Sequence, residues 1–184
     1  MTVTLATWTV EEYHELVATG VLRDRAVELL NGQIVEMPPE GPEHRYLGEE
    51  AATYLRRKLG SRARVSEARP ITLLKQGSEP EPDISVVRPL GEVYYERHPY
   101  PEDVFLVIEF SKSSLAKDLE VKRKTYAAAG LKDYWVSNLK ARELVVHRDP
   151  VNGDYRSVEV LRSGTLSLLA FPDVEISVSS LFKR

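Results

Sequence analysis

The chain of 184 residues contains no cysteine. Disulfide frameworks, zinc sites built on cysteine and thiolate catalysis are therefore excluded, and nothing points to an oxidising compartment. Apolar runs are short, and none approaches the length that spans a bilayer. The first ten residues, MTVTLATWTV, lack the basic and apolar regions of a signal peptide. We therefore expect a cytoplasmic protein with no membrane segment.

The chain also has little excess charge of either sign. Its formal net charge is -3 and its pI is near 5.9. These values argue against a protein that binds nucleic acid through its overall charge, although a local basic face stays open. Basic residues are concentrated in two places, within 56–64 and within 117–124. Each cluster is either the solvated end of a helix or a phosphate contact. The length suits one domain, residues 1–184, with a core of its own.

Local signals predict the first elements. Thr9 and Glu12 have the spacing of a capping box, so a helix is expected over residues 10–19. The Asn31-Gly32 pair between apolar segments predicts a hairpin of residues 25–30 and 33–37 across a type I′ turn. From His44 the apolar spacing becomes helical, and this helix should run to residue 59.

The middle of the chain predicts an α/β (α+β) fold with a mixed sheet. Strands are expected at 63–67, 70–75, 84–88 and 104–110, then a helix over 114–129 and a strand over 133–138 that buries Tyr134 and Trp135. The element order is interpreted as α-β-β-β-α-β. Antiparallel strands at 143–149 and 155–161, around Asn152-Gly153, should complete the C-terminal part.

Glu109 directly follows the apolar run Val104–Ile108, so it should be buried, and a buried carboxylate needs a partner. At 100° per residue, Lys122 lies on the apolar face of the helix 114–129, together with Leu115, Leu119, Tyr126 and Ala129. Lys117 and Lys124 should point to solvent. We therefore expect Lys122 to meet Glu109. In the alternative, Lys122 forms an ordinary ion pair with Asp118, one turn earlier.

Asp83 offers a second carboxylate, because it starts a strand that should lie beside 104–110. Two adjacent carboxylates repel each other, and a divalent cation removes that conflict. Carboxylates, a main-chain carbonyl and waters form the oxygen-rich site that suits Mg²⁺ or Mn²⁺. The alternative is that Asp83 is a turn residue that binds nearby amides.

A family resemblance rests on three pieces: the "PD" at 82–83, the acid of "LVIEFS" at 109, and "DLEVKRKTYAAAGLKDYWVSN" at 118–138. They resemble the Uma2 family, once called DUF820, which belongs to the PD-(D/E)XK nuclease superfamily. The resemblance implies a restriction-endonuclease-like domain with its core at about 42–138. The chain departs from the E-x-K pattern because position 111 is serine. The resemblance implies that the lysine has moved to Lys122, while Lys112 is out of register.

The resemblance implies that Asp83, Glu109 and Lys122 are catalytic, with Asp83 and Glu109 as ligands of Mg²⁺ or Mn²⁺. Glu28, His44 and Asp118 are possible additions. Glu28 resembles a family acid, or else it is a surface charge of the hairpin, and His44 meets a substrate phosphate or caps its helix.

The expected activity is metal-dependent endonucleolytic cleavage of DNA by a homodimer or higher homo-oligomer, since two related sites cut both strands most simply. The alternatives are a module of this fold that binds nucleic acid or protein without turnover, and hydrolysis of RNA or of a nucleotide.

Overall fold

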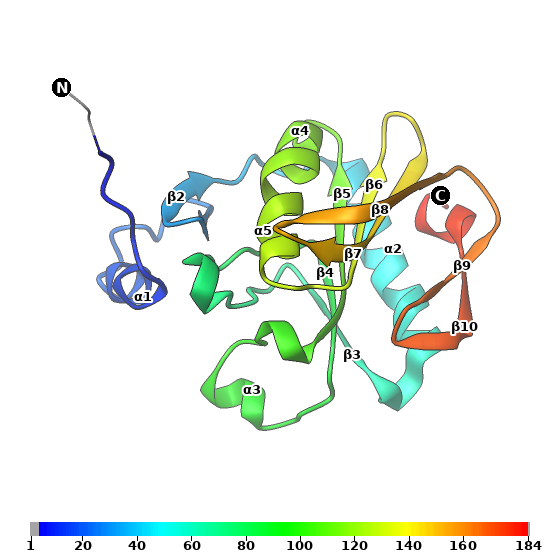
Figure 1. Ribbon diagram of the computed structural model, residues 1–184, viewed down its shortest axis with the longest axis horizontal. Coiled ribbons are helices and arrows are strands. Elements are labelled where there is room, and N and C mark those ends of the chain that lie inside the picture. The colour runs from blue at the N-terminus through cyan, green and yellow to red at the C-terminus, as the bar shows by residue number, and fades with distance from the viewer. Residues whose placement is uncertain (1–3, 184) are drawn as a thin grey trace.

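The computed structural model describes residues 4–183, and a six-stranded mixed sheet forms its centre (Figure 1). The strands follow the order β3-β4-β5-β6-β7-β8, and only the pair β5–β6 is parallel. Their bounds are Arg64–Glu67, Ile84–Val87, Val104–Ser111, Asp133–Asn138, Glu143–Val151 and Asp154–Leu161. The predicted neighbours, strands 84–88 and 104–110, do pair, with Ile84 opposite Ile108.

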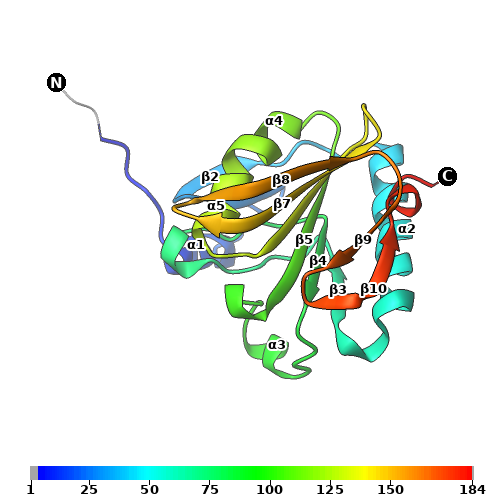
Figure 2. The ribbon, with the colours of Figure 1, turned by 45° about the vertical axis from the view of Figure 1, so that its right-hand side comes forward.

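Helices cover both faces of this sheet (Figure 2). One face packs on α2 (Pro42–Leu59) and on the C-terminal hairpin of β9 (Thr165–Leu168) and β10 (Phe171–Ser177). The other face packs on the segment with α4 (Leu115–Lys117) and α5 (Arg123–Ala128). Side chains alternate between faces along a strand. In β5, Leu106 and Ile108 contact the α2 side and Val107 the α5 side, which places Glu109 on the face covered by α5.

The N-terminal helix α1 (Val10–Ala18) and the hairpin of β1 (Val27–Leu30) and β2 (Gln33–Glu36) pack on each other beside the sheet. The capping box of Thr9 and Glu12 is confirmed, and so is the turn, because Asn31 and Gly32 have φ of 51° and 74°. Gly32 donates to the Gly77 carbonyl over 2.8 Å, and Glu79 N–H donates to the Leu29 carbonyl over 2.8 Å. These bonds dock β1 on the segment that leads into β4.

The expected strand at 70–75 is wrong. Ile71 N–H donates to the Pro80 carbonyl, Thr72 N–H to the Pro99 carbonyl and Leu73 N–H to the Ser78 carbonyl, so the segment bonds to loops and not to the sheet. Pro70 has no N–H to offer to a strand ladder. Without this strand, the core elements follow the predicted order α-β-β-β-α-β.

The helix expected over 114–129 is not one regular helix. Asp118–Lys122 forms a π-helical turn between α4 and α5. The connection 89–102 holds a short helix, α3 (Val93–Glu96), and 3₁₀ turns occur at Gly60–Arg62, Leu74–Gln76, Pro101–Asp103 and Val178–Leu181. Tyr134 and Trp135 are buried, as predicted. Within residues 4–183, no helix has the length and apolar character needed to cross a bilayer.

Candidate active site

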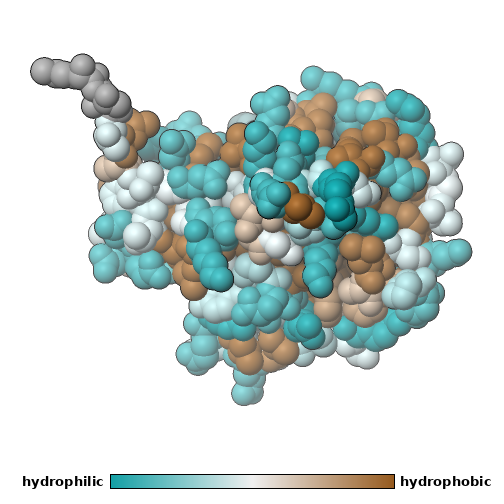
Figure 3. All heavy atoms as spheres, in the orientation of Figure 1, coloured by the Kyte–Doolittle hydropathy of each residue, from teal (hydrophilic) through white to brown (hydrophobic). Residues whose placement is uncertain are grey.

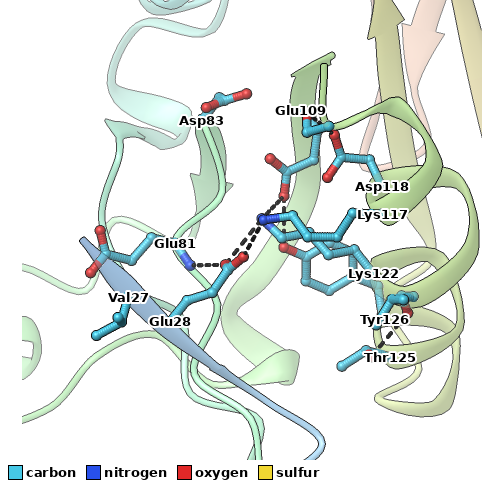
Figure 4. Close-up of polar contacts among 12 residues, drawn as sticks. Val27, Glu28, Glu81, Asp83, Glu109, Lys117, Asp118, Lys122, Thr125 and Tyr126 are labelled. Carbon is cyan, nitrogen blue, oxygen red and sulfur yellow. Dashed lines mark hydrogen bonds and ion pairs between the residues drawn. The ribbon is translucent and has the colours of Figure 1, made fainter. Parts of the chain in front are cut away.

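An ion cluster lies where β5, β1 and the π turn meet (Figure 4). Lys122 Nζ lies 2.9 Å from Glu109 Oε1 and 3.1 Å from Glu28 Oε2. None of the three residues is more than 3% exposed. The structure thus brings Lys122 to Glu109, as the helical spacing predicts, and adds Glu28 from the hairpin.

Glu28 is the most heavily paired acid of the cluster. Its Oε1 accepts a hydrogen bond from Lys117 Nζ over 2.8 Å, and its Oε2 accepts one from the Glu81 N–H over 3.2 Å. The interpretation of Glu28 as a surface charge is therefore wrong, and so is the expected solvent orientation of Lys117. In an α-helix, residues five apart differ by about 140° in direction. The wider π turn reduces this angle, so Lys117 and Lys122 both reach Glu28.

Asp83 joins three elements at the edge of the sheet. Its Oδ2 accepts a hydrogen bond from the Phe110 N–H over 2.6 Å and lies 3.1 Å from His44 Nε2. His44 belongs to the first turn of α2, but its ring contacts Asp83 instead of capping that helix. The other ring nitrogen, Nδ1, lies 3.8 Å from Glu40 Oε2. Asp83 accepts a hydrogen bond from a main-chain amide, as the turn interpretation predicts. Its contact with His44 also connects α2 to β5, which the turn interpretation does not predict.

Asp118 is buried but belongs to a different group of contacts. Its Oδ2 accepts hydrogen bonds from the hydroxyls of Ser111, over 2.6 Å, and Ser114, over 2.7 Å. No ion pair joins Asp118 to Lys122 in the described chain, so the ordinary salt bridge considered from the sequence is not formed. Ser111, at the position where E-x-K has lysine, thus connects the end of β5 to the π turn.

Sequence reasoning missed two members of the site, Tyr126 and Lys117. The Tyr126 hydroxyl donates to Glu109 Oε1 over 2.9 Å, the same oxygen that Lys122 contacts. Tyr126 stands four residues after Lys122, so the helical face that identified the lysine also placed this hydroxyl beside it. The spacing signal for Tyr126 was therefore present, but the residue was counted only as an apolar contact.

The electrostatics follow from burial and from the excess of carboxylates. Burial raises the pKa of Glu109, and the charges of Asp83, Asp118 and Glu28 add to this effect, against the opposing effect of Lys122. Burial also acts to raise the pKa of Glu28, but the ammonium groups of Lys122 and Lys117 outweigh it and lower that pKa. Burial acts to lower the pKa of Lys122, but Glu109 and Glu28 outweigh it and raise it. Lys122 is therefore charged, and Glu109 is the carboxyl that most readily holds a proton.

The two acids expected to bind metal each keep one oxygen free of protein contacts. Among residues 4–183, every hydrogen bond to these carboxylates engages Asp83 Oδ2 or Glu109 Oε1. Asp83 Oδ1 and Glu109 Oε2 are thus available to bind an ion. Both are hard oxygen ligands of the type that Mg²⁺ and Mn²⁺ prefer. The donor set fits such an ion.

A cleft of about 480 Å³ adjoins this edge of the sheet through His44. Lys112, Lys140 and Ser113 also line it, together with the N-terminus of α2. Lys112 contacts Glu43 over 2.8 Å, outside the Glu109 cluster, as its register predicts. A larger hollow, about 1060 Å³, lies near the other end of β5 around Val104, and none of the candidate site residues lines it. Of the candidate site residues, His44 lines the smaller cleft, and His44 contacts Asp83.

The basic cluster within 56–64 lies far from these carboxylates. Arg56 follows His44 by twelve residues along α2, which corresponds to about 18 Å. Arg56 pairs with Glu67, and Arg62 pairs with Asp173. Of the cluster within 117–124, Lys117 and Lys122 lie in the site, while Arg123 pairs with Asp154. Most of these residues therefore stabilise the fold or the site.

Comparison with known proteins agrees with the fold. A chain from Anabaena variabilis ATCC 29413, described as a putative nuclease belonging to DUF820, has a similar structure, with a TM-score of 0.69 and 18% sequence identity over 95% of this chain and 97% of that one. A search of curated proteins gave no match. The profile of the Uma2 family, described as "Putative restriction endonuclease", matches residues 10–179. Because this match spans nearly the whole sequence, the chain belongs to the Uma2 family.

Proposed function

We propose that the protein is a metal-dependent endonuclease that hydrolyses phosphodiester bonds of DNA. One observation carries the proposal: Asp83 and Glu109 each leave one carboxylate oxygen without a hydrogen bond, and Glu109 also contacts the buried ammonium group of Lys122. Membership of a family of restriction-endonuclease type supports the reaction class. Mg²⁺ or Mn²⁺ is the proposed cofactor, since the free ligands are carboxylate oxygens.

The proposed role of each residue follows from its charge and its contacts. Asp83 Oδ1 and Glu109 Oε2 would hold the ion, which supplies a water of lowered pKa and neutralises phosphate charge when bound. His44 and the Phe110 amide keep Asp83 in place. Tyr126 and Lys122 hold the other oxygen of Glu109. The Lys122 ammonium group stabilises negative charge that develops on the phosphate, and Glu28 holds this ammonium group in position.

The substrate would enter through the cleft beside His44. Lys112 and Lys140 line it together with Glu40 and Glu43, and Lys112 pairs with Glu43. The cluster within 56–64 is remote. Phosphate contacts of this type bind without reading sequence, and their strength decreases with salt. Lys112→Ala and Lys140→Ala should therefore weaken binding and reduce its dependence on salt.

The direct test is cleavage of plasmid and single-stranded DNA with Mg²⁺ or Mn²⁺. Asp83→Ala, Glu109→Gln and Lys122→Met should each lower the rate by at least about 100-fold, because each removes a charge that acts on the transition state. Lys124→Met is the matched control for the lysine, since Lys124 is exposed two residues later. Equal rates in wild type and all variants would mean that a contaminant cleaves the DNA. An RNA substrate in parallel tests the choice of nucleic acid.

The second candidate function is a nuclease-like module that binds without turnover. Ser111 in the E-x-K position and the full pairing of Lys122 by two carboxylates favour it. Thermal melts and calorimetry separate the two. In an active site, Mn²⁺ at one hundred times its Kd should add about 2.7 kcal/mol to the free energy of unfolding, and Glu109→Gln should abolish this gain. The inactive module predicts no carboxylate-dependent binding.

A further inference from the structure

Two histidines and a glutamate converge away from the site described above. His14 lies on α1, Glu79 in the loop before β4, and His98 in the connection before β5. One ligand atom from each lies within 4.8 Å of the other two, and His14 Nε2 lies 2.7 Å from Glu79 Oε1. Three segments that are distant in the sequence thus present a nitrogen, an oxygen and a nitrogen to one point.

Glu79 is the buried centre of this group. It is 4% exposed, and no lysine or arginine within residues 4–183 forms an ion pair with it. Burial of a carboxylate without a cation is unfavourable. Its second oxygen, Oε2, accepts a hydrogen bond from the Thr72 hydroxyl over 2.6 Å. Outer hydrogen bonds of this kind orient a carboxylate that binds metal, and here the bond directs Oε1 toward the histidines.

The surrounding backbone holds the three ligands in place. Glu79 N–H donates to the Leu29 carbonyl, and Thr72 N–H donates to the Pro99 carbonyl over 2.9 Å, which fixes the chain directly after His98. The rings of His14 and His98 lie edge to face with centroids 6.3 Å apart. Half of the His14 side chain is exposed, so water reaches the point where the ligands meet.

We propose that His14, Glu79 and His98 bind a transition-metal ion of the zinc class. Two imidazoles and one carboxylate are a ligand set found in zinc sites that keep a fourth position for water. Imidazole suits zinc, copper and nickel, whereas Mg²⁺ prefers oxygen alone, so this site and the carboxylates around Glu109 select different ions. Ligands of one tetrahedral ion lie about 3.4 Å apart. The His14–Glu79 distance of 2.7 Å and the 4.8 Å limit for the group bracket that spacing, and both imidazole rings are exposed, so they have room to rotate toward it.

The bound ion would fasten α1 to the body of the protein. It would join α1 to the loop that docks β1, and β1 carries Glu28 into the Lys122 cluster. The ion therefore stabilises the N-terminal part without taking part in the proposed hydrolysis, and the inference does not depend on the proposed function.

The test is a titration of metal-free protein with Zn²⁺ in the presence of excess Mg²⁺, followed by calorimetry, with Co²⁺ absorption as a second readout. His14→Ala and His98→Ala remove exposed ligands, so both variants should fold. Loss of a residue that only hydrogen-bonds to a metal ligand lowers metal affinity by about 10–100-fold. Loss of a ligand itself, as in each of these two variants, should weaken Zn²⁺ binding by at least that much. Thr72→Val should weaken it about tenfold. His44→Ala is the matched control, because Glu40, His44 and Asp83 also bring ligand atoms within 4.8 Å of one another. This variant should keep the Zn²⁺ binding that depends on His14 and His98.

Hydrogen exchange gives a readout that depends on position. Zn²⁺ should slow amide exchange in α1 of the wild type and not in His14→Ala. Tight one-to-one binding that requires His14 and His98 and is weakened in Thr72→Val supports the proposal. Absence of Zn²⁺ binding to the wild type overturns the proposal. Zn²⁺ binding that persists in His14→Ala and is lost in His44→Ala also overturns it.

Discussion

Tyr126 shows how one hydroxyl can matter for the proposed chemistry. It donates to Glu109 Oε1, while the rings of Tyr126 and Tyr134 pack edge to face. Tyr126→Phe keeps the ring but removes the hydrogen bond to Glu109 Oε1. We expect a loss of about 1 kcal/mol in the free energy of unfolding, as for one hydrogen bond. DNA cleavage should fall by about tenfold, as for the loss of an outer partner of a metal ligand.

Tyr155 provides the matched control for this prediction. Its ring also stacks on Tyr134, and its hydroxyl donates to the Leu131 carbonyl over 2.7 Å, away from the carboxylates. Tyr155→Phe should cost similar stability in a urea melt and leave cleavage unchanged. If both variants lose activity equally, the Tyr126 hydroxyl has no specific effect on Glu109.

His147 makes the fold sensitive to acid. The residue is buried between Tyr134 and Tyr155, and its Nδ1 has no hydrogen-bond partner in the described chain. Burial, with help from the Arg123 charge, lowers the pKa of His147 to about 4. A histidine with a depressed pKa takes up a proton on unfolding between about pH 6.5 and pH 4, so its contribution to stability falls as pH falls through that window.

The size of this effect can be measured with His147→Phe, which keeps a ring in the stack. The shift corresponds to about 3 kcal/mol, or about 2 kcal/mol with allowance for solvent screening. Urea melts from pH 7 to pH 4 should show a smaller loss of stability in His147→Phe than in wild type by about that amount. Tyr155→Phe, which removes no group that titrates in this range, should keep the wild-type slope. Equal slopes in His147→Phe and wild type would contradict the assignment.

At the scale of elements, the π turn Asp118–Lys122 decides which lysines face the site. A π turn holds one residue more than an α-helical turn. Deletion of the exposed Glu120 should convert it to α-helix while α5, anchored by Tyr126, keeps its place. Residues before the deletion then rotate by about 100°, so Lys117 leaves Glu28.

The deletion variant should remain folded but lose at least about 2 kcal/mol of stability, because Glu28 keeps only one of its two cations. Cleavage should fall as well. Glu120→Ala changes the same exposed position without changing the helix and should behave like wild type in melts and assays. Full activity in the deletion variant would mean that Lys117 and the π turn are dispensable.

At the scale of the whole molecule, the edge of the sheet suggests how two copies could meet. The edge strand β8 exposes Val158 and Val160, each by about half. In Figure 3, hydrophobic side chains on this face are scattered among hydrophilic ones, with one group over β8 at the centre. Exposed edge strands tend to pair with other chains.

We expect a homodimer through β8, which stays a prediction. Light scattering at micromolar concentration should give about twice 20.8 kDa, and Val158→Lys should give a monomer. Val17→Lys, which changes a similarly exposed valine of α1, should remain dimeric. A wild-type monomer under these conditions would rule out the dimer.

The sequence by itself determined the features that depend on neighbouring residues. The capping box of Thr9, the turn at Asn31-Gly32 and the burial of Glu109 follow from short-range geometry and from the apolar run before the acid. The helical period also brought Lys122 to the correct face, because periodicity is a property of a single element. Metal-ligand and catalytic roles of these residues stay proposals.

Only the tertiary structure decided which further charges join Glu109 and Lys122. The docking of the hairpin on residues 77–79 buries Glu28, and the π turn brings Lys117 to it. The segment 70–75 has the composition of a strand but bonds to loops instead of the sheet. Hydrogen-bond and ion-pair partners are set by which distant segments pack together, and periodicity within one element holds no information about that choice.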